Sequence, residues 1–118
     1  MSVVLLIDDE PQMEALLGMC LEDMNARVIR AGSAREAWIA ARTERPAVVL
    51  LDIGLGSEDG LDILDGFRDD PALADVPVLV FSIHDSRRRE ALARGADGFV
   101  AKPFRLAGLR AMVEARLQ

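Results

Sequence analysis

Three uninterrupted apolar runs divide the chain, and each one ends in polar side chains. The runs are VVLLI at residues 3–7, AVVLL at 47–51 and VLVF at 78–81. Apolar runs of this length predict strands that are buried on both faces of a sheet. Asp8 and Asp9 follow the first run, Asp52 follows the second, and Ser82 follows the third. Ligands bind at the carboxyl ends of parallel strands, so these four residues are candidates for one site.

The remaining patterns predict five helices that alternate with five strands. The weaker strands are expected at residues 27–31 and 98–101, and the helices at 11–24, 34–43, 61–68, 86–94 and 106–117. Strands that alternate with helices predict a parallel sheet with right-handed crossovers and helices on both faces. The predicted fold class is therefore a doubly wound (βα)5 α/β fold with strand order 2-1-3-4-5, which places the three most apolar strands at the centre.

Length and composition favour one globular domain over residues 1–118. Half of the 118 residues are apolar, and no apolar run is long enough for a bilayer span, so we expect no membrane partner. The net charge of -6 argues against direct nucleic-acid binding. The charge is uneven, because residues 1–79 carry 16 acids and 6 bases, whereas residues 80–118 carry 4 acids and 8 bases. The single cysteine, Cys20, is in keeping with a cytoplasmic location.

The predicted strand order brings the first and third strands side by side at their carboxyl ends. Asp8, Asp9 and Asp52 would then converge, and three close carboxylates need a cation to remain charged. Oxygen ligands without imidazole or thiolate suit Mg²⁺, with Mn²⁺ as the alternative. Lys102 at the end of the fifth strand adds a positive charge, and Ser82 adds a hydroxyl. This combination predicts a phosphoryl site in which a carboxylate itself can be the nucleophile and form an acyl phosphate.

The residues of this predicted site resemble the receiver domain of two-component response regulators, over essentially the whole chain. The matching motifs are Asp8-Asp9, Asp52, Asp59-Gly60, Ser82, Phe99 and Lys102-Pro103-Phe104. The resemblance implies a flavodoxin-like fold and a phosphorelay function. It also implies that Asp52 accepts a phosphoryl group from a histidine kinase or a phosphotransfer protein. Such a domain catalyses its own phosphorylation and dephosphorylation and does not turn over external substrates.

The resemblance further implies a role for each site residue. Asp9, Asp52 and the backbone carbonyl of Gly54 would bind Mg²⁺, and Asp8 would act through water. The Lys102–Pro103 bond would be cis, which only X-Pro bonds adopt at low cost. Ser82 and Phe99 would form a conformational switch that controls an output face over residues 86–117. Independently of the resemblance, we expect the arginines of this face to contact an acidic partner or a second receiver; the alternative is a plain solvated face. These residues are Arg87, Arg88, Arg89, Arg94, Arg105, Arg110 and Arg116, and the run 87–89 is the part to test by substitution.

Several positions depart from the family pattern. Leu55 and Gly56 replace a common methionine and proline, and Ile83 replaces a small residue after Ser82. If Ile83 narrows the pocket, small phosphodonors should react slowly and Ile83→Ala should relieve this; if it turns outward, it has no such effect. His84 and Gly54 flank the expected phosphoryl group, where the family's residues influence its lifetime, although a plain solvent-exposed histidine is the simpler interpretation.

Three alternative functions were weighed against a phosphorylated receiver. A phosphohydrolase of the haloacid-dehalogenase type needs a second acid two residues after the nucleophile, and that position is Gly54. A flavodoxin-like nucleotide binder is disfavoured because acids, not a phosphate-cradling glycine loop, follow the first strand. A pseudo-receiver that serves as an unphosphorylated interaction module stays open.

Overall fold

The computed structural model describes residues 1–54 and 59–117. The strands of the sheet are β1 (Ser2–Ile7), β2 (Ala26–Ala31), β3 (Val48–Asp52), β4 (Val78–Ser82) and β5 (Gly98–Ala101). The helices are α1 (Pro11–Cys20), α2 (Ala34–Glu44), α3 (Gly60–Asp69), the 3-10 helix η1 (Asp85–Arg87), α4 (Arg88–Ala93) and α5 (Leu106–Glu114). All strand pairs are parallel and their order is 2-1-3-4-5, which confirms the predicted flavodoxin-like fold.

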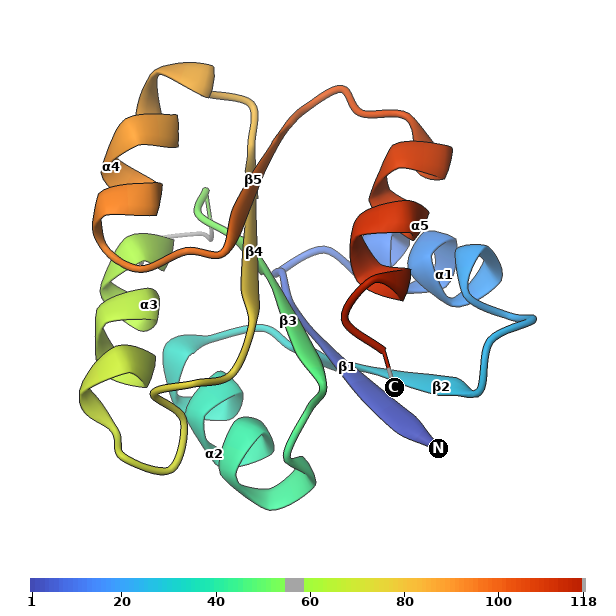
Figure 1. Cartoon of the computed structure of the whole chain (residues 1–118), viewed down its shortest axis with the longest axis horizontal. Coiled ribbons are helices and arrows are strands. Elements are labelled where there is room, and N and C mark those ends of the chain that lie inside the picture. The colour runs from blue at the N-terminus through green and yellow to red at the C-terminus, as the bar shows by residue number, and fades with distance from the viewer. Residues whose placement is uncertain (55–58, 118) are drawn as a thin grey trace.

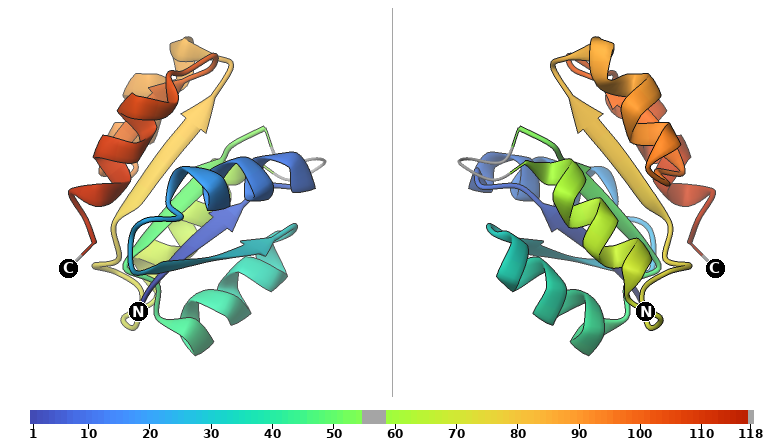
Figure 2. Two further views of the ribbon diagram at one scale, coloured as in Figure 1. Left: turned by 90° about the vertical axis from the view of Figure 1, so that its right-hand side faces the viewer. Right: turned by 90° about the vertical axis from the view of Figure 1, so that its left-hand side faces the viewer.

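Side chains from successive strand positions point into two separate apolar layers. Leu5 and Ile7 of β1 pack with α2, α3 and α4, whereas Val4 and Leu6 pack with α1 and α5. The same alternation holds along β3 and β4, because successive residues of a strand face opposite sides of a sheet. Helices therefore cover both faces of the sheet (Figures 1 and 2). This explains why the central strands are apolar at every position.

The structure corrects three details of the sequence prediction. The first helix ends at Cys20 rather than near Met24, although Leu21 stays buried through a tight turn that leads into β2. The polar helix after β4 is split into the short elements η1 and α4. The last helix ends at Glu114 rather than at residue 117, and its first residue, Leu106, is exposed.

Gly60, the first residue of α3, fits directly against the end of β3. A Cβ atom at this position would lie 2.5 Å from Ile53 Cα and 2.9 Å from the Asp52 carbonyl oxygen. Backbone atoms cannot move aside as the end of a flexible side chain can, so only glycine allows this approach. The contact fixes the start of α3 relative to Asp52.

We predict that Gly60→Ala lowers the free energy of unfolding by about 2 kcal/mol or more, because the new methyl group overlaps the β3 backbone. Gly66→Ala, in the same helix, is the matched control, since nothing lies within 4 Å of its added Cβ. That control should be neutral or stabilising by up to about 1 kcal/mol. Urea unfolding of both variants tests this, and equal stabilities would contradict the packing argument.

Candidate functional site

Asp52 occupies the last position of β3 and has a defined partner for each carboxylate oxygen. Its Oδ2 lies 2.9 Å from Lys102 Nζ, and its Oδ1 accepts a hydrogen bond of 2.9 Å from the Gly54 backbone N–H. Asp52 is only 9 % exposed. The Lys102 ammonium also lies 4.7 Å from the centre of the Phe81 ring. Asp52 is thus a largely buried carboxylate held toward the end of β5.

Asp8 lies beside Asp52 because β1 and β3 pair in parallel, with Ile7 opposite Leu51. The side chain is 3 % exposed, and its Oδ1 accepts a hydrogen bond of 2.9 Å from the Glu10 N–H. Burial raises the pKa of the Asp8 carboxyl, and the charges of Asp52 and Asp9 raise it further, against the Glu10 N–H and Lys102, which lower it. The site therefore has more negative charge than Lys102 alone balances.

These residues fit a hard divalent cation. In the described residues, no group of three or more acidic, histidine or cysteine side chains is already gathered around a common point. Mg²⁺, however, commonly takes only one or two protein carboxylates and fills its other positions with water and phosphate oxygens. The crowded carboxylates of Asp8 and Asp52, with Asp9 exposed at the rim, provide that donor set.

The two residues predicted to form the switch lie on β4 and β5, and β4 is the strand that pairs with the Asp52 end of β3. Ser82 is 2 % exposed, and its Oγ accepts a hydrogen bond of 2.9 Å from the His84 N–H. Its backbone carbonyl accepts a bond from the Lys102 N–H, which ties β4 to the lysine, and the Lys102–Pro103 bond is cis, as the resemblance implied. Phe99 is largely buried, with 6 % of its surface exposed. The Arg88 guanidinium lies 4.9 Å from the centre of its ring.

The structure distinguishes between the alternatives that the sequence left open for Ile83 and His84. Ile83 is 68 % exposed, so the structure favours the outward orientation over a narrowed pocket. Leu55 and Gly56 lie outside the described residues. His84 is exposed at the edge of the site.

Sequence reasoning also missed contacts that only the folded chain creates. Arg30 of β2 donates a hydrogen bond of 3.0 Å to the Asp8 backbone carbonyl. Arg87 pairs with Asp59 and Glu90, and Arg88 pairs with Asp85. Both arginines were predicted to serve an outside partner, but they have partners within the chain.

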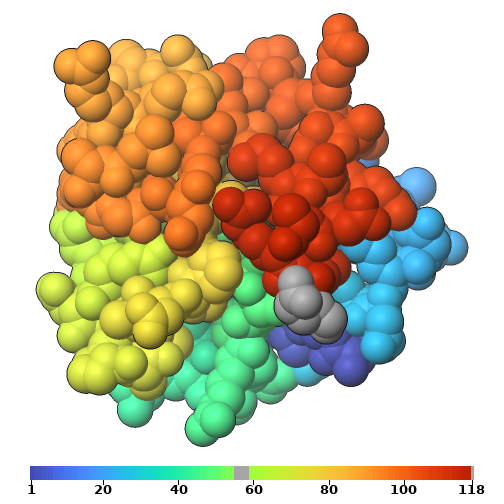
Figure 3. All heavy atoms as spheres, in the orientation of Figure 1, coloured from blue at the N-terminus to red at the C-terminus, as the bar shows by residue number. Residues whose placement is uncertain are grey.

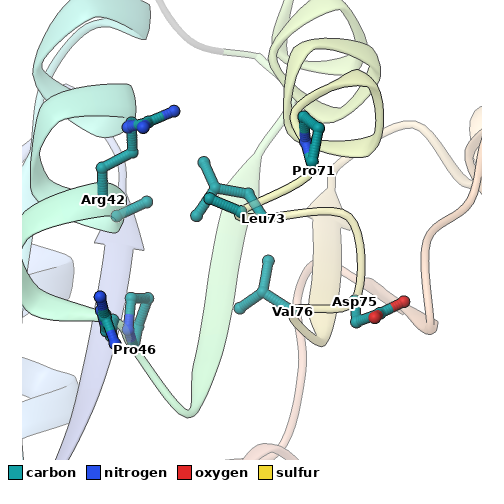
Figure 4. Close-up of a pocket in the computed structure, with 9 residues that line it drawn as sticks. Arg42, Pro46, Pro71, Leu73, Asp75 and Val76 are labelled. Carbon is teal, nitrogen blue, oxygen red and sulfur yellow. The ribbon is translucent and has the colours of Figure 1, made fainter.

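A separate cavity of about 480 Å³ lies at the opposite edge of the sheet (Figure 4). Arg42 and Pro46 line one side of it, and Pro71, Leu73 and Val76 line the other. Pro46 and Val76 precede β3 and β4, so the cavity opens at the amino ends of the strands. It is therefore distinct from the acidic site at their carboxyl ends.

Comparison with known proteins agrees with this geometry. The fold and its acidic edge define an α/β signalling domain of the receiver class. The model of the response regulator receiver domain family matches residues 4–114, and the chain belongs to this family. It is a receiver domain of two-component signalling, a class that interacts with histidine kinases and output domains and does not turn over external substrates. Membership in this family removes the phosphohydrolase and nucleotide-binder alternatives.

Similar proteins include both full-length regulators and isolated receivers. The transcriptional regulatory protein KdpE of Mycobacterium tuberculosis is 41% identical over 119 residues, which cover 96% of this chain and 51% of that protein. KdpE of Escherichia coli is 32% identical over 100% of this chain and 52% of its own. The chain thus spans about half the length of the curated relatives it matches. No helix in the described residues is long and apolar enough to cross a membrane.

Solved structures give the same result for the fold. The chemotaxis response regulator CheY4 of Vibrio cholerae superposes with a TM-score of 0.88 at 25% identity, covering 99% of both chains. The receiver domain of NtrX from Brucella abortus has a TM-score of 0.86 at 31% identity, covering 97% of both chains.

The raised pKa of Asp8 predicts how pH and Mg²⁺ affect stability. At a pH below 3.8, the pKa of Asp8 in the unfolded chain, the carboxyl is protonated in both the folded and the unfolded state. Between this pH and the higher pKa of Asp8 in the folded chain, the folded chain binds more protons than the unfolded chain. The Asp8 contribution to stability therefore falls as pH rises through this interval and stays lower above it. In metal-free buffer at pH 7, Asp8→Asn should raise the free energy of unfolding by about 1 kcal/mol and weaken this pH dependence.

The free energy of unfolding, measured with and without Mg²⁺, tests whether the Asp8 carboxylate is part of a metal site. Mg²⁺ should stabilise the wild type more than it stabilises Asp8→Asn. Asp75→Asn, which removes an exposed acid at the other end of the sheet, should respond to pH and Mg²⁺ as the wild type does. An Asp8→Asn protein that is less stable without metal, yet equally stabilised by Mg²⁺, would contradict the electrostatic interpretation.

Proposed function

We propose that residues 1–118 act as one receiver domain that accepts a phosphoryl group on Asp52. The donor is the phosphohistidine of a histidine kinase or phosphotransfer protein. One observation carries the proposal: the Asp52 carboxylate lies 2.9 Å from Lys102 Nζ beside the buried Asp8 carboxylate. A nucleophilic oxygen, a cation for the incoming phosphoryl oxygens and an acidic metal site are thereby in one place.

Asp9, Asp52 and the backbone carbonyl of Gly54 would hold Mg²⁺, or Mn²⁺ in its place, and Asp8 would act through a bound water. When bound, the ion supplies positive charge that offsets the carboxylates and the phosphoryl oxygens. The chain's own residues do the remaining work. Lys102 orients Asp52 and then binds an oxygen of the transferred group as a point charge.

The transfer step conserves the phosphoryl group. A carboxylate oxygen of Asp52 forms a bond to phosphorus while the P–N bond to the donor histidine breaks, and the imidazole nitrogen keeps the electron pair. The product is an acyl phosphate on Asp52. Attack of water on phosphorus later releases inorganic phosphate and restores the carboxylate. Both steps occur on Asp52 of the domain itself. The domain therefore alternates between a phosphorylated and an unphosphorylated form and does not act on outside substrates.

Phosphorylation would act on the switch through Ser82. To reach a phosphate oxygen, the Ser82 hydroxyl has to give up its present contact with the His84 N–H. The segment that follows, η1 and α4, begins the 86–117 output face, which spreads across the upper part of the view in Figure 3. Phe99 is already buried in this structure, so its part in the switch would be a change of packing beneath Arg88.

On the output face, the arginines that could meet an acidic partner or a second receiver are Arg89 and Arg105. Both are exposed, and within the described residues neither side chain has a charged or hydrogen-bonded partner. Arg87, Arg88, Arg94 and Arg110 already form ion pairs inside the chain. We therefore assign the outward contact to Arg89 and Arg105.

We predict that Mg²⁺ and acetyl phosphate add one phosphoryl group to the wild type and none to Asp52→Asn, as measured by intact mass. Asp75→Asn, an exposed acid away from the site, should be modified like the wild type. Omission of Mg²⁺ should abolish the adduct. If the wild type remains unmodified, even with a phosphorylated histidine kinase as donor, the pseudo-receiver alternative is correct.

A further inference from the structure

A network of charged side chains joins α3 to α4 on one face of the sheet. Both guanidinium Nη atoms of Arg87 lie 3.2 Å from the two carboxylate oxygens of Asp59, and Arg87 also pairs with Glu90. Arg94, at the end of α4, pairs with Glu90 and with two acids of α3, Asp62 and Asp65. In Figure 1, α4 lies above α3 on the same side of the sheet. Ion pairs therefore link them at both ends of α4.

Apolar packing of α4 is slight, which makes these pairs important for its position. Ala91 is the buried residue of this six-residue helix. A single exposed ion pair contributes little to stability, but a bidentate arginine–carboxylate pair within a network is the exception. Arg87 draws the pKa of the Asp59 carboxyl below its usual value, which agrees with the geometry.

The Asp59–Arg87 pair also connects the two segments that phosphorylation would disturb. Asp59 caps α3 through a 3.0 Å bond from the Leu61 N–H, immediately before Gly60 packs on the Asp52 carbonyl. Arg87 donates its backbone N–H to the His84 carbonyl at 3.0 Å. Since the His84 N–H binds the Ser82 hydroxyl, a shift of Ser82 and His84 is transmitted directly to Arg87.

We propose that the Asp59–Arg87 ion pair is a clasp that holds η1 and α4 in the resting position and opposes the phosphorylated conformation. This regulatory role rests on the proposed function of Asp52. The clasp lies in the route from Ser82 to the output face, and it is present together with the His84–Ser82 hydrogen bond that phosphorylation would break. Ligands and substitutions shift a conformational equilibrium only by their different free energies in its two states. Loss of the clasp therefore favours the active state.

The test uses beryllofluoride with Mg²⁺ as a stable phosphoryl analogue, titrated calorimetrically against the whole chain. Asp59→Asn removes the charge but keeps a side-chain oxygen that can cap α3. Arg87→Gln removes the other partner. Each variant should bind beryllofluoride about two- to fivefold more tightly than the wild type, and the double variant no more tightly than either single one. Arg35→Gln, which changes an exposed arginine of α2 without a partner in the described residues, is the matched control and should bind like the wild type.

The outcomes separate the clasp from the function on which it rests. At high salt, the wild type should bind beryllofluoride as tightly as the variants do, because ions screen the exposed Asp59–Arg87 pair. Tighter binding in both single variants but not in Arg35→Gln supports the clasp. Unchanged or weaker binding in folded variants, as verified by urea unfolding, overturns the clasp while leaving phosphorylation of Asp52 intact. If the wild type binds no beryllofluoride, the proposed function is contradicted, and so is the regulatory role of the clasp.

Discussion

The crowding of carboxylates at the carboxyl ends of β1 and β3 is the constraint on which the candidate site depends. Parallel pairing places Asp8 next to Asp52, and burial then raises the pKa of Asp8. Such an arrangement costs stability in the isolated chain, because two acids share one ammonium group. That cost is useful in a binding site, since a cation or a phosphoryl group with its metal would meet charge that the protein has left unbalanced.

The surrounding fold makes this unfavourable arrangement possible. Apolar side chains fill both layers beside the central strands, so the strands cannot slide to separate the acids. Gly60 brings the start of α3 against the backbone of Asp52 and Ile53. By contrast, the elements after Ser82 are short and polar. The same molecule therefore joins a rigid support for Asp52 to a segment that is held mainly by charged contacts.

The sequence predicted the sheet well, because the three central strands are continuous apolar runs that end in acids or serine. The strand order followed from the number of strands, and it placed the three most apolar strands at the centre. Side-chain pairing could not be predicted in this way. Arg87 and Asp59 are 28 residues apart, and their contact depends on how η1 and α3 are placed relative to each other. For the same reason, a run of three arginines was interpreted as one outward surface, whereas two of them have partners inside the chain.

The division of that arginine run has a consequence for how a signal could leave the site. Arg87 binds the segment before α3, and Arg88 covers the ring of Phe99. These adjacent residues thus contact two different parts of the domain, and only Arg89 of the three faces solvent without a partner in the described residues. A displacement of η1 would change the Asp59 contact, the cover over Phe99 and the direction of Arg89 together. The covalent linkage of these three neighbouring residues would then couple the acidic site, the aromatic residue and the outer surface.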